Sequence, residues 1–180
     1  KEIGPQGGRP ATAHRTVLKV IWFVLVTGCR WKDVPMEMGC CGETARTRLQ
    51  TWERAGIWDQ LHQLLLTMLN HEKQLHLETV VIDTTHVRAF GGGDATGPSP
   101  VDRRKKGTKY TLLVDREGVP LVIRAVPANR SDHLEILPTV VSFPKVAGKP
   151  GRPRTHPDNL YADAGFDCEG TRSILRWLGI

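Results

Sequence analysis

The sequence lacks long hydrophobic runs and paired cysteine motifs. Its longest apolar run, Val20–Val26, has seven residues, whereas a membrane-spanning helix needs about 20. The chain begins with Lys1 in place of a methionine, and no small-residue cleavage site of a secretory signal follows the apolar run. Its four cysteines form no C-x-x-C pair, which favours buried, reduced thiols over a disulfide framework or a metal knuckle. We therefore expect a protein of a reducing compartment with no membrane partner.

The charge balance, in contrast, is strongly one-sided. The 180 residues carry 25 Lys and Arg against 19 Asp and Glu, a formal net charge of +6, and the sequence pI is about 9.4. Such an excess favours a polyanionic partner, with nucleic acid as the first candidate. The length suits one compact domain plus a small accessory region, and 39% hydrophobic residues suffice for a buried core.

Hydrophobic periodicity changes near residue 78, where we place a domain boundary. Residues 1–78 have helical spacing, with helices expected over 12–27 (before Gly28), over 44–55, and from an N-cap at Asp59 to about residue 69. This pattern resembles a helix-turn-helix, in which Arg46 and Arg48 would contact DNA phosphates. A helical bundle with a solvated basic face fits the pattern equally well.

Residues 79–180 have short β-branched runs separated by Gly, Pro and Asp, in the order β-β-β-α-β-α. Asp132 and Glu135 are spaced for a capping box at the first of these helices. Three consecutive strands suit a meander, and the helix can carry the chain to a fourth strand parallel to the first. The fold class predicted is α/β, the opening part of a ribonuclease H-like mixed sheet, preceded by an all-α region.

Two aspartates stand at the ends of apolar strands. Asp83 interrupts the run that begins at Val80, a run expected to be covered on both sheet faces, and Asp163 ends the fourth strand. If the first and fourth strands are neighbours, the two carboxylates converge and call for a divalent cation. Oxygen ligands select Mg²⁺ or Mn²⁺, and two such ions can assist phosphodiester displacement. In the alternative interpretation both aspartates only cap turns. His86 faces the opposite side of the strand, which favours a structural role.

Basic residues gather in two segments rich in Gly and Pro. We expect both segments to be extended and mobile, and to follow a phosphate backbone with salt-dependent affinity; solvated loops are the alternative. The predicted DNA contacts are Arg103, Arg104, Lys105, Lys106 and Lys109 in the first segment and Lys149, Arg152 and Arg154 in the second.

Several blocks of the sequence together resemble a known family. TGCRWKDVPMEMG and TARTRLQTWERAGIWDQL, then IDTTHVRAFGGGDATGPSPVDRRKKGTKYTLLVDREGVPL, ANRSDH and GRPRTHPDNLYADAGFD are similar to bacterial insertion-sequence transposases with an aspartate-aspartate-glutamate (DDE) site. The resemblance implies that Asp83 and Asp163 are the two catalytic, metal-binding aspartates. The third acid of the family, a glutamate on a later helix, has no counterpart here, so we expect a C-terminally incomplete core that is inactive alone.

The resemblance also implies a function. This function is metal-dependent cleavage and transfer of DNA strands at the inverted-repeat ends of a mobile element. A complete site would hold two Mg²⁺ or Mn²⁺ ions, and the protein would act as a homodimer on double-stranded DNA. The implied location is bacterial, cytoplasmic and nucleoid-associated. Two alternatives stay open. One is a non-catalytic DNA-binding protein or repressor derived from a transposase, and the other is a ribonuclease H-like nuclease.

Overall fold

The computed structural model describes residues 11–147 and 151–180, and the chain divides into two compact units, Lys1–His62 and Gln63–Ile180. The division falls inside helix α3 (Ile57–His71), earlier than the predicted boundary near residue 78. Packing explains the difference, because Trp58 joins the apolar cluster of the first unit while Leu66 is buried in the core of the second. α3 thus contributes to both units.

The first unit is helical, as predicted. Its main helices besides the start of α3 are α1 (His14–Thr27) and α2 (Gly42–Arg54), joined through the short 3-10 helices η1 (Trp31–Asp33) and η2 (Met36–Met38). α1 ends at Gly28 with φ 67°, a left-handed C-cap. α3 begins at Ile57, so Asp59 lies in its first turn and is not the N-cap that we predicted. The chain turns one residue earlier, at Gly56, where φ is 66°.

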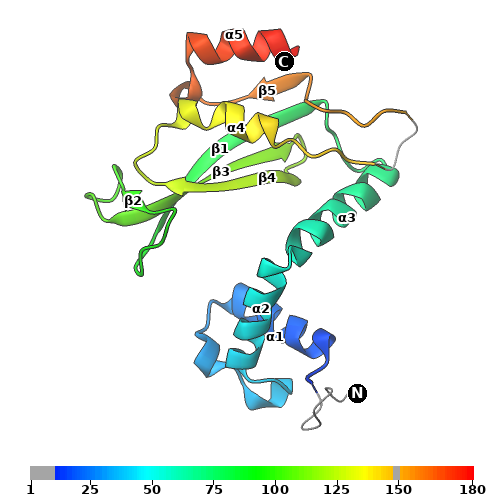
Figure 1. The fold of residues 1–180 in the computed structure, drawn as a ribbon, viewed down its shortest axis with the longest axis vertical. Coiled ribbons are helices and arrows are strands. Elements are labelled where there is room, and N and C mark those ends of the chain that lie inside the picture. The colour runs from blue at the N-terminus through cyan, green and yellow to red at the C-terminus, as the bar shows by residue number, and fades with distance from the viewer. Residues whose placement is uncertain (1–10, 148–150) are drawn as a thin grey trace. The chain divides into compact units, whose positions relative to one another are not determined.

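The second unit is a mixed sheet with helices. Figure 1 shows its elements, which are β1 (Thr79–Arg88), β2 (Gly97–Pro98), β3 (Lys106–Asp115), β4 (Pro120–Pro127), η3 (Asp132–Leu134), α4 (Ile136–Val141), β5 (Asn159–Tyr161), η4 (Ala164–Phe166) and α5 (Glu169–Leu178). β3 pairs antiparallel with both β1 and β4, and β5 pairs parallel with β1. This is the predicted α/β class and the predicted ribonuclease H-like strand arrangement. The short strand β2, which pairs with β3, was not predicted.

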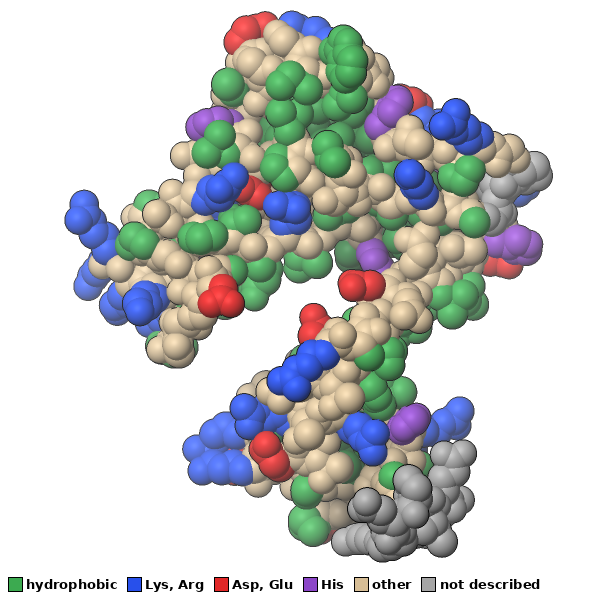
Figure 2. All heavy atoms as spheres, in the orientation of Figure 1, with side chains coloured by type: hydrophobic (Ala, Val, Ile, Leu, Met, Phe, Trp, Pro, Cys, Tyr) green, Lys and Arg blue, Asp and Glu red, His purple; other side chains and the backbone are tan. Residues whose placement is uncertain are grey.

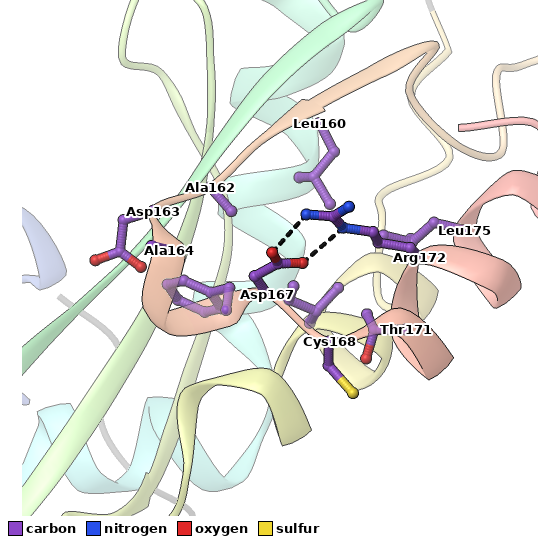
Figure 3. Close-up of a pocket in the computed structure, with 11 residues that line it drawn as sticks. Leu160, Ala162, Asp163, Ala164, Asp167, Cys168, Thr171, Arg172 and Leu175 are labelled. Carbon is purple, nitrogen blue, oxygen red and sulfur yellow. Dashed lines mark hydrogen bonds and ion pairs between the residues drawn. The ribbon is translucent and has the colours of Figure 1, made fainter.

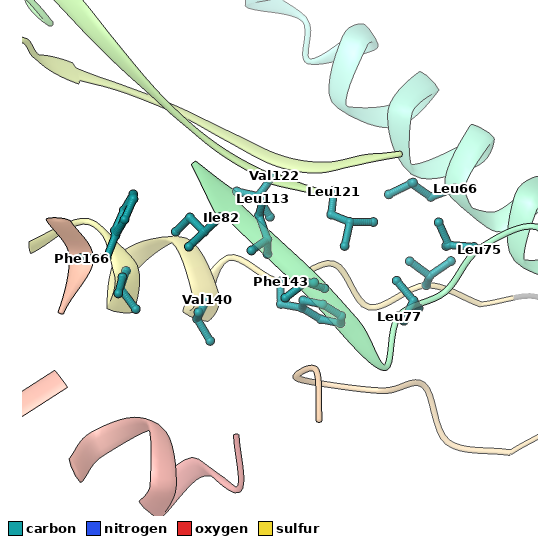
Figure 4. Packing of buried hydrophobic residues seen from close by; sticks show 13 residues of the cluster. Leu66, Leu75, Leu77, Ile82, Leu113, Leu121, Val122, Val140, Phe143 and Phe166 are labelled. Atoms are coloured by element: carbon teal, nitrogen blue, oxygen red, sulfur yellow. The ribbon is translucent and has the colours of Figure 1, made fainter. Parts of the chain in front are cut away.

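The core of this unit lies on one face of the sheet. Ile82 and Leu113 point from β1 and β3 toward Val140, Phe143 and Phe166, as Figure 4 shows. The helices α4 and α5 are on this side (Figure 1). The opposite face, which we call the open face, carries exposed side chains, among them Val81 (38% exposed), Ile123 (66%) and Tyr161 (61%). The prediction that the residues before Asp83 are covered on both faces is therefore wrong.

Two smaller predictions also fail. Asp132 and Glu135 form no capping box, because neither side chain caps a helix end; both carboxylates bond to basic side chains of the sheet and loops instead. All four cysteines are free, but only Cys40 is buried, while Cys41 and Cys168 are exposed. Within the described ranges, no helix is long and apolar enough to cross a membrane.

Candidate active site

The two predicted metal ligands follow the paired stretch of β1 and β5, with Asp83 inside β1 and Asp163 beyond the end of β5. The two strands are parallel, and their last pair is Val81 with Tyr161. Asp83 follows two residues later within β1, whereas Asp163 lies two residues past the end of β5, at the N-cap of η4. Because side chains alternate along a strand, Asp83 lies on the open face with Val81. Both aspartates therefore follow the same paired stretch of β1 and β5, and their convergence on one ion stays a prediction.

Each of these carboxylates uses one oxygen for a local hydrogen bond. The Oδ1 atom of Asp83 accepts from the backbone N–H of Thr84 at 2.7 Å, and that of Asp163 accepts from the N–H of Gly165 at 2.9 Å. The bond to Gly165 is the turn that the alternative interpretation predicted. Both aspartates are exposed. A turn bond through one oxygen leaves the second carboxylate oxygen for a ligand, so the two interpretations are compatible.

A hollow of about 350 Å³ lies beside Asp163. Asp167 on its wall is held by Arg172, whose Nε donates to Oδ1 at 2.6 Å, and this hydrogen bond raises the pKa of the Arg172 guanidinium. In Figure 3 the side chain of Asp163 points away from this pair. The charge of Asp167 is thus neutralised locally, and Asp163 is the acid of this turn that remains open to a ligand.

A third carboxylate, Asp132, lies close to the site and was missed as a site residue. Its Oδ1 accepts from Lys109 Nζ at 2.7 Å and from Thr84 Oγ1 at 3.3 Å. Its Oδ2 lies near Gly165, since a methyl group there would be 3.7 Å from it. The sequence contained one signal for this contact. Lys109 lies two residues before Thr111 in β3, so both side chains are on the same, buried face of the sheet, and a buried lysine requires a partner.

The donor chemistry fits a hard cation at Asp83 and Asp163. Both side chains offer only oxygen, and carboxylate oxygen is the ligand that Mg²⁺ and Mn²⁺ prefer. Within residues 11–147 and 151–180, no three His, Cys, Asp or Glu side chains gather closely enough to form a complete ligand set. Asp132 does not complete the set, because its Oδ1 is occupied by an ammonium group. The site thus offers two ligands.

The first basic segment forms a hairpin turn between β2 and β3 and is not the extended loop that we expected. Arg103 and Arg104 have φ values of 48° and 60°, and the Ser99 N–H donates to the carbonyl of Lys105 at 2.8 Å. Figure 2 shows Lys and Arg side chains gathered over this end of the sheet. The segment therefore presents its charges on a fixed turn, which reduces the entropy lost on binding a phosphate backbone.

An ion pair braces this hairpin. Arg88 Nε and Nη2 donate to the two oxygens of Asp102 at 2.7 and 3.0 Å, and these bonds hold the pKa of the Asp102 carboxyl below its ordinary value. The predicted contacts Arg103, Arg104 and Lys105 are exposed beside it. Lys106, also exposed, begins β3.

The other predicted DNA contacts differ in their surroundings. Lys109 is in β3 and only 3% exposed, so the prediction that it contacts phosphate from a loop is wrong for this conformation; its ammonium is consumed by Asp132. Arg152 is exposed, Arg154 pairs with Asp158, and Lys149 lies outside the described residues.

On α2, the two predicted arginines have different partners. Arg46 forms an ion pair with Glu43 at 3.2 Å. Arg48 is half-buried and lines a shallow hollow together with Thr44, Thr47 and other polar residues of the same helix. α2 therefore offers one polar, basic face, which is compatible both with a DNA-reading helix and with a solvated bundle surface.

Comparisons with known proteins find similar sequences among proteins of insertion elements. Residues 1–62 match the family described as "Putative transposase of IS4/5 family". The chain is also 44% identical over 94 residues to the "Insertion element IS402 uncharacterized 16.2 kDa protein" of Burkholderia cepacia. Over these parts, the chain is similar to proteins encoded by insertion elements. It is 38% identical over 89 residues to the "Putative transposase for insertion sequence element IS402" of the same organism.

The matches cover parts of the proteins compared. The chain spans 64% and 42% of the two relatives, which align with 52% and 49% of it. Two solved structures are also similar over 95% of the chain, the Mos1 strand transfer complex (TM-score 0.35) and the Mos1 transposase paired-end complex with the left transposon end (0.34). Both are 12% identical, and the chain covers 58% of each.

Proposed function

We propose that the chain acts in DNA transposition, with Asp83 and Asp163 as two acids of a metal-dependent site that cleaves and transfers DNA strands. The observation that supports the proposal is the parallel pairing of β1 with β5, whose last pair, Val81 with Tyr161, lies two residues before each aspartate. Bound there, Mg²⁺ or Mn²⁺ would supply Lewis-acid stabilisation for in-line displacement at a phosphodiester. No covalent intermediate with the protein is required.

The residues of the chain contribute positioning. Asp83 is fixed by β1, which is hydrogen-bonded between β3 and β5, and the rotation of Asp163 is restricted by its bond to the Gly165 N–H. Both carboxylates therefore face a phosphodiester with little rotational freedom left to lose. The hairpin with Arg103 and Arg104 would hold the backbone of the DNA through salt-dependent contacts.

DNA partners belong to the same proposal. The basic hairpin and the α2 face with Arg46 and Arg48 would bind the ends of the mobile element and the target duplex, and two copies of the chain would pair two ends. Each phosphate that a Lys or Arg neutralises adds about 0.9 to the slope of log affinity against log salt concentration. The Arg103→Gln, Arg104→Gln double variant should therefore reduce this slope by about two for duplex DNA.

A transposition assay with the intact element tests the catalytic part. We expect Asp83→Asn and Asp163→Asn each to abolish movement of the element, because neutral amides cannot hold the cation in place of carboxylates. The matched control is Asp94→Asn, at an exposed aspartate in the loop before β2, which should leave the frequency unchanged. Movement that survives Asp83→Asn would refute the assignment.

The non-catalytic alternative is an outcome of the same experiment. If the unaltered element does not move, and the purified chain binds a duplex of the element's terminal sequences equally well with and without Mg²⁺, the chain is a DNA-binding protein derived from a transposase. Cleavage without preference for those ends would instead favour the general nuclease.

A further inference from the structure

The segment between β4 and α4 is tied to the sheet by two buried charged groups. Lys109 is 3% exposed, and its Nζ donates to the carbonyl of Arg130 at 2.6 Å and to Asp132 Oδ1 at 2.7 Å. An ammonium group buried this deeply needs such partners. Lys109 therefore fixes the position of Asp132 relative to the middle of β3.

Glu135 ties the other end of the same segment. Its side chain is 0% exposed and bonds to Arg130, while Arg124 of β4 lies 3.6 Å from its Oε2. Removing water from a carboxylate is costly unless basic groups compensate. Because both ends of the segment are anchored, Asp132 has a fixed location beside β1 and β3.

From this location Asp132 contacts Thr84 of β1 and approaches Gly165 in the turn that follows β5. Its Oδ1 accepts from Thr84 Oγ1 at 3.3 Å, one residue after Asp83 in β1. Its Oδ2 faces Gly165, where an added methyl group would lie 3.7 Å from this oxygen and 3.1 Å from Asp163 Oδ1. Gly165 therefore lies between the carboxylates of Asp132 and Asp163, and an added methyl group there would press on Asp163 Oδ1 while making ordinary contact with Asp132 Oδ2.

We infer that Asp132, held by Lys109, is a positioning residue that sets the distance between Asp83 and the turn carrying Asp163. It acts through Thr84 on one side and through the close approach to Gly165 on the other. It is not a ligand itself, because the Lys109 ammonium already neutralises it. An effect of Asp132 on metal affinity rests on the proposed function, whereas its effect on the order of the turn at Gly165 does not.

The first test needs no metal. Amide proton exchange measured by NMR should be faster at Gly165 in Asp132→Asn and in Lys109→Met, because the turn loses its support, while the amide of Leu113 in the core strand keeps its protection. A merely structural role would expose both amides together. Thr84→Val, which replaces only a hydroxyl by a methyl, gives a milder variant if the first two do not fold. Exchange at Gly165 equal to that of the Asp94→Asn control in all folded variants would overturn the inference.

The second test is a Mn²⁺ titration of the same purified proteins. We expect Asp132→Asn to lower the affinity for Mn²⁺ about tenfold or more, as is typical when a residue that supports metal ligands is removed. Gly165→Ala should lower this affinity as well. If Asp83→Asn lowers the affinity for Mn²⁺ and Asp132→Asn does not, the inference fails while the proposed function stands. If Asp83→Asn has no effect, the proposed function fails, and the exchange at Gly165 alone decides about Asp132.

Discussion

Asp115 is the residue whose removal should destabilise the second unit most clearly. It is 1% exposed and accepts three backbone hydrogen bonds, from the N–H of Glu117 at 3.0 Å, of Val119 at 2.8 Å and of His76 at 3.0 Å. The first two close the hairpin between β3 and β4, and the third ties down the segment that leads into β1. One side chain thus joins the start of the site-bearing strand to the neighbouring hairpin.

The magnitude of the loss follows from the three bonds. Hydrogen bonds to a charged group contribute about 1.5–3 kcal/mol each, but the N–H groups of the exposed hairpin regain water when the carboxylate is absent. We therefore expect Asp115→Ala to lower the free energy of unfolding by about 3 kcal/mol. Asp115→Asn keeps the Oδ1 acceptor but presents an NH₂ group to the N–H of His76, so it should lose about 1 kcal/mol.

The assay is urea unfolding followed through amide resonances of β1 and β3, which report the second unit alone. The control is Asp94→Ala at an exposed loop position, which should change stability by less than about 0.5 kcal/mol. The ordering expected is control, then Asn, then Ala at position 115. An Asp115→Ala variant as stable as the control would refute the reasoning.

Two further predictions concern the first unit and a matched helix. Gly42→Ala would place a methyl group 1.8 Å from the Trp31 carbonyl oxygen and should destabilise the first unit by about 1–3 kcal/mol. Gly170 has open space around it, so Gly170→Ala should stabilise the second unit by up to about 1 kcal/mol. Thermal unfolding of both variants checks that the two changes in stability have opposite signs. The pKa of the exposed Cys41 thiol is lowered chiefly by its hydrogen bond to Thr44, whereas burial raises the pKa of the Cys40 thiol. Cys41 should therefore react with iodoacetamide faster than Cys40. Peptide mass spectrometry that finds Cys40 labelled first would contradict this.

Much of the fold could be predicted because local patterns and topology rules agreed. The glycine that ends α1 and the β-branched runs of β1, β3 and β4 are local signals. The parallel placement of β5 beside β1 followed from the connecting helix. How Asp163 lies relative to Asp83 depends in addition on the turn that follows β5, which no local pattern sets.

What the sequence could not supply were long-range partners of charged side chains. Asp132 and Glu135 have capping-box spacing, but Lys109 and Arg130 offer stronger, partly desolvated ion pairs, so tertiary contacts replaced the local one. The same holds for the basic hairpin, whose order depends on Asp102 pairing with a residue of β1, a contact that no local pattern records.

The central claim is that Asp83 and Asp163 hold the same divalent ion, and a double-mutant cycle on Mn²⁺ affinity tests it most directly. The variants are Asp83→Asn, Asp163→Asn and the double substitution, with Asp94→Asn as control. If one ion needs both carboxylates, each single variant should lose about tenfold in affinity or more, about 1.4 kcal/mol, and the double variant should lose much less than the sum of the two. Fully additive losses, or no loss in either single variant, would contradict a shared site.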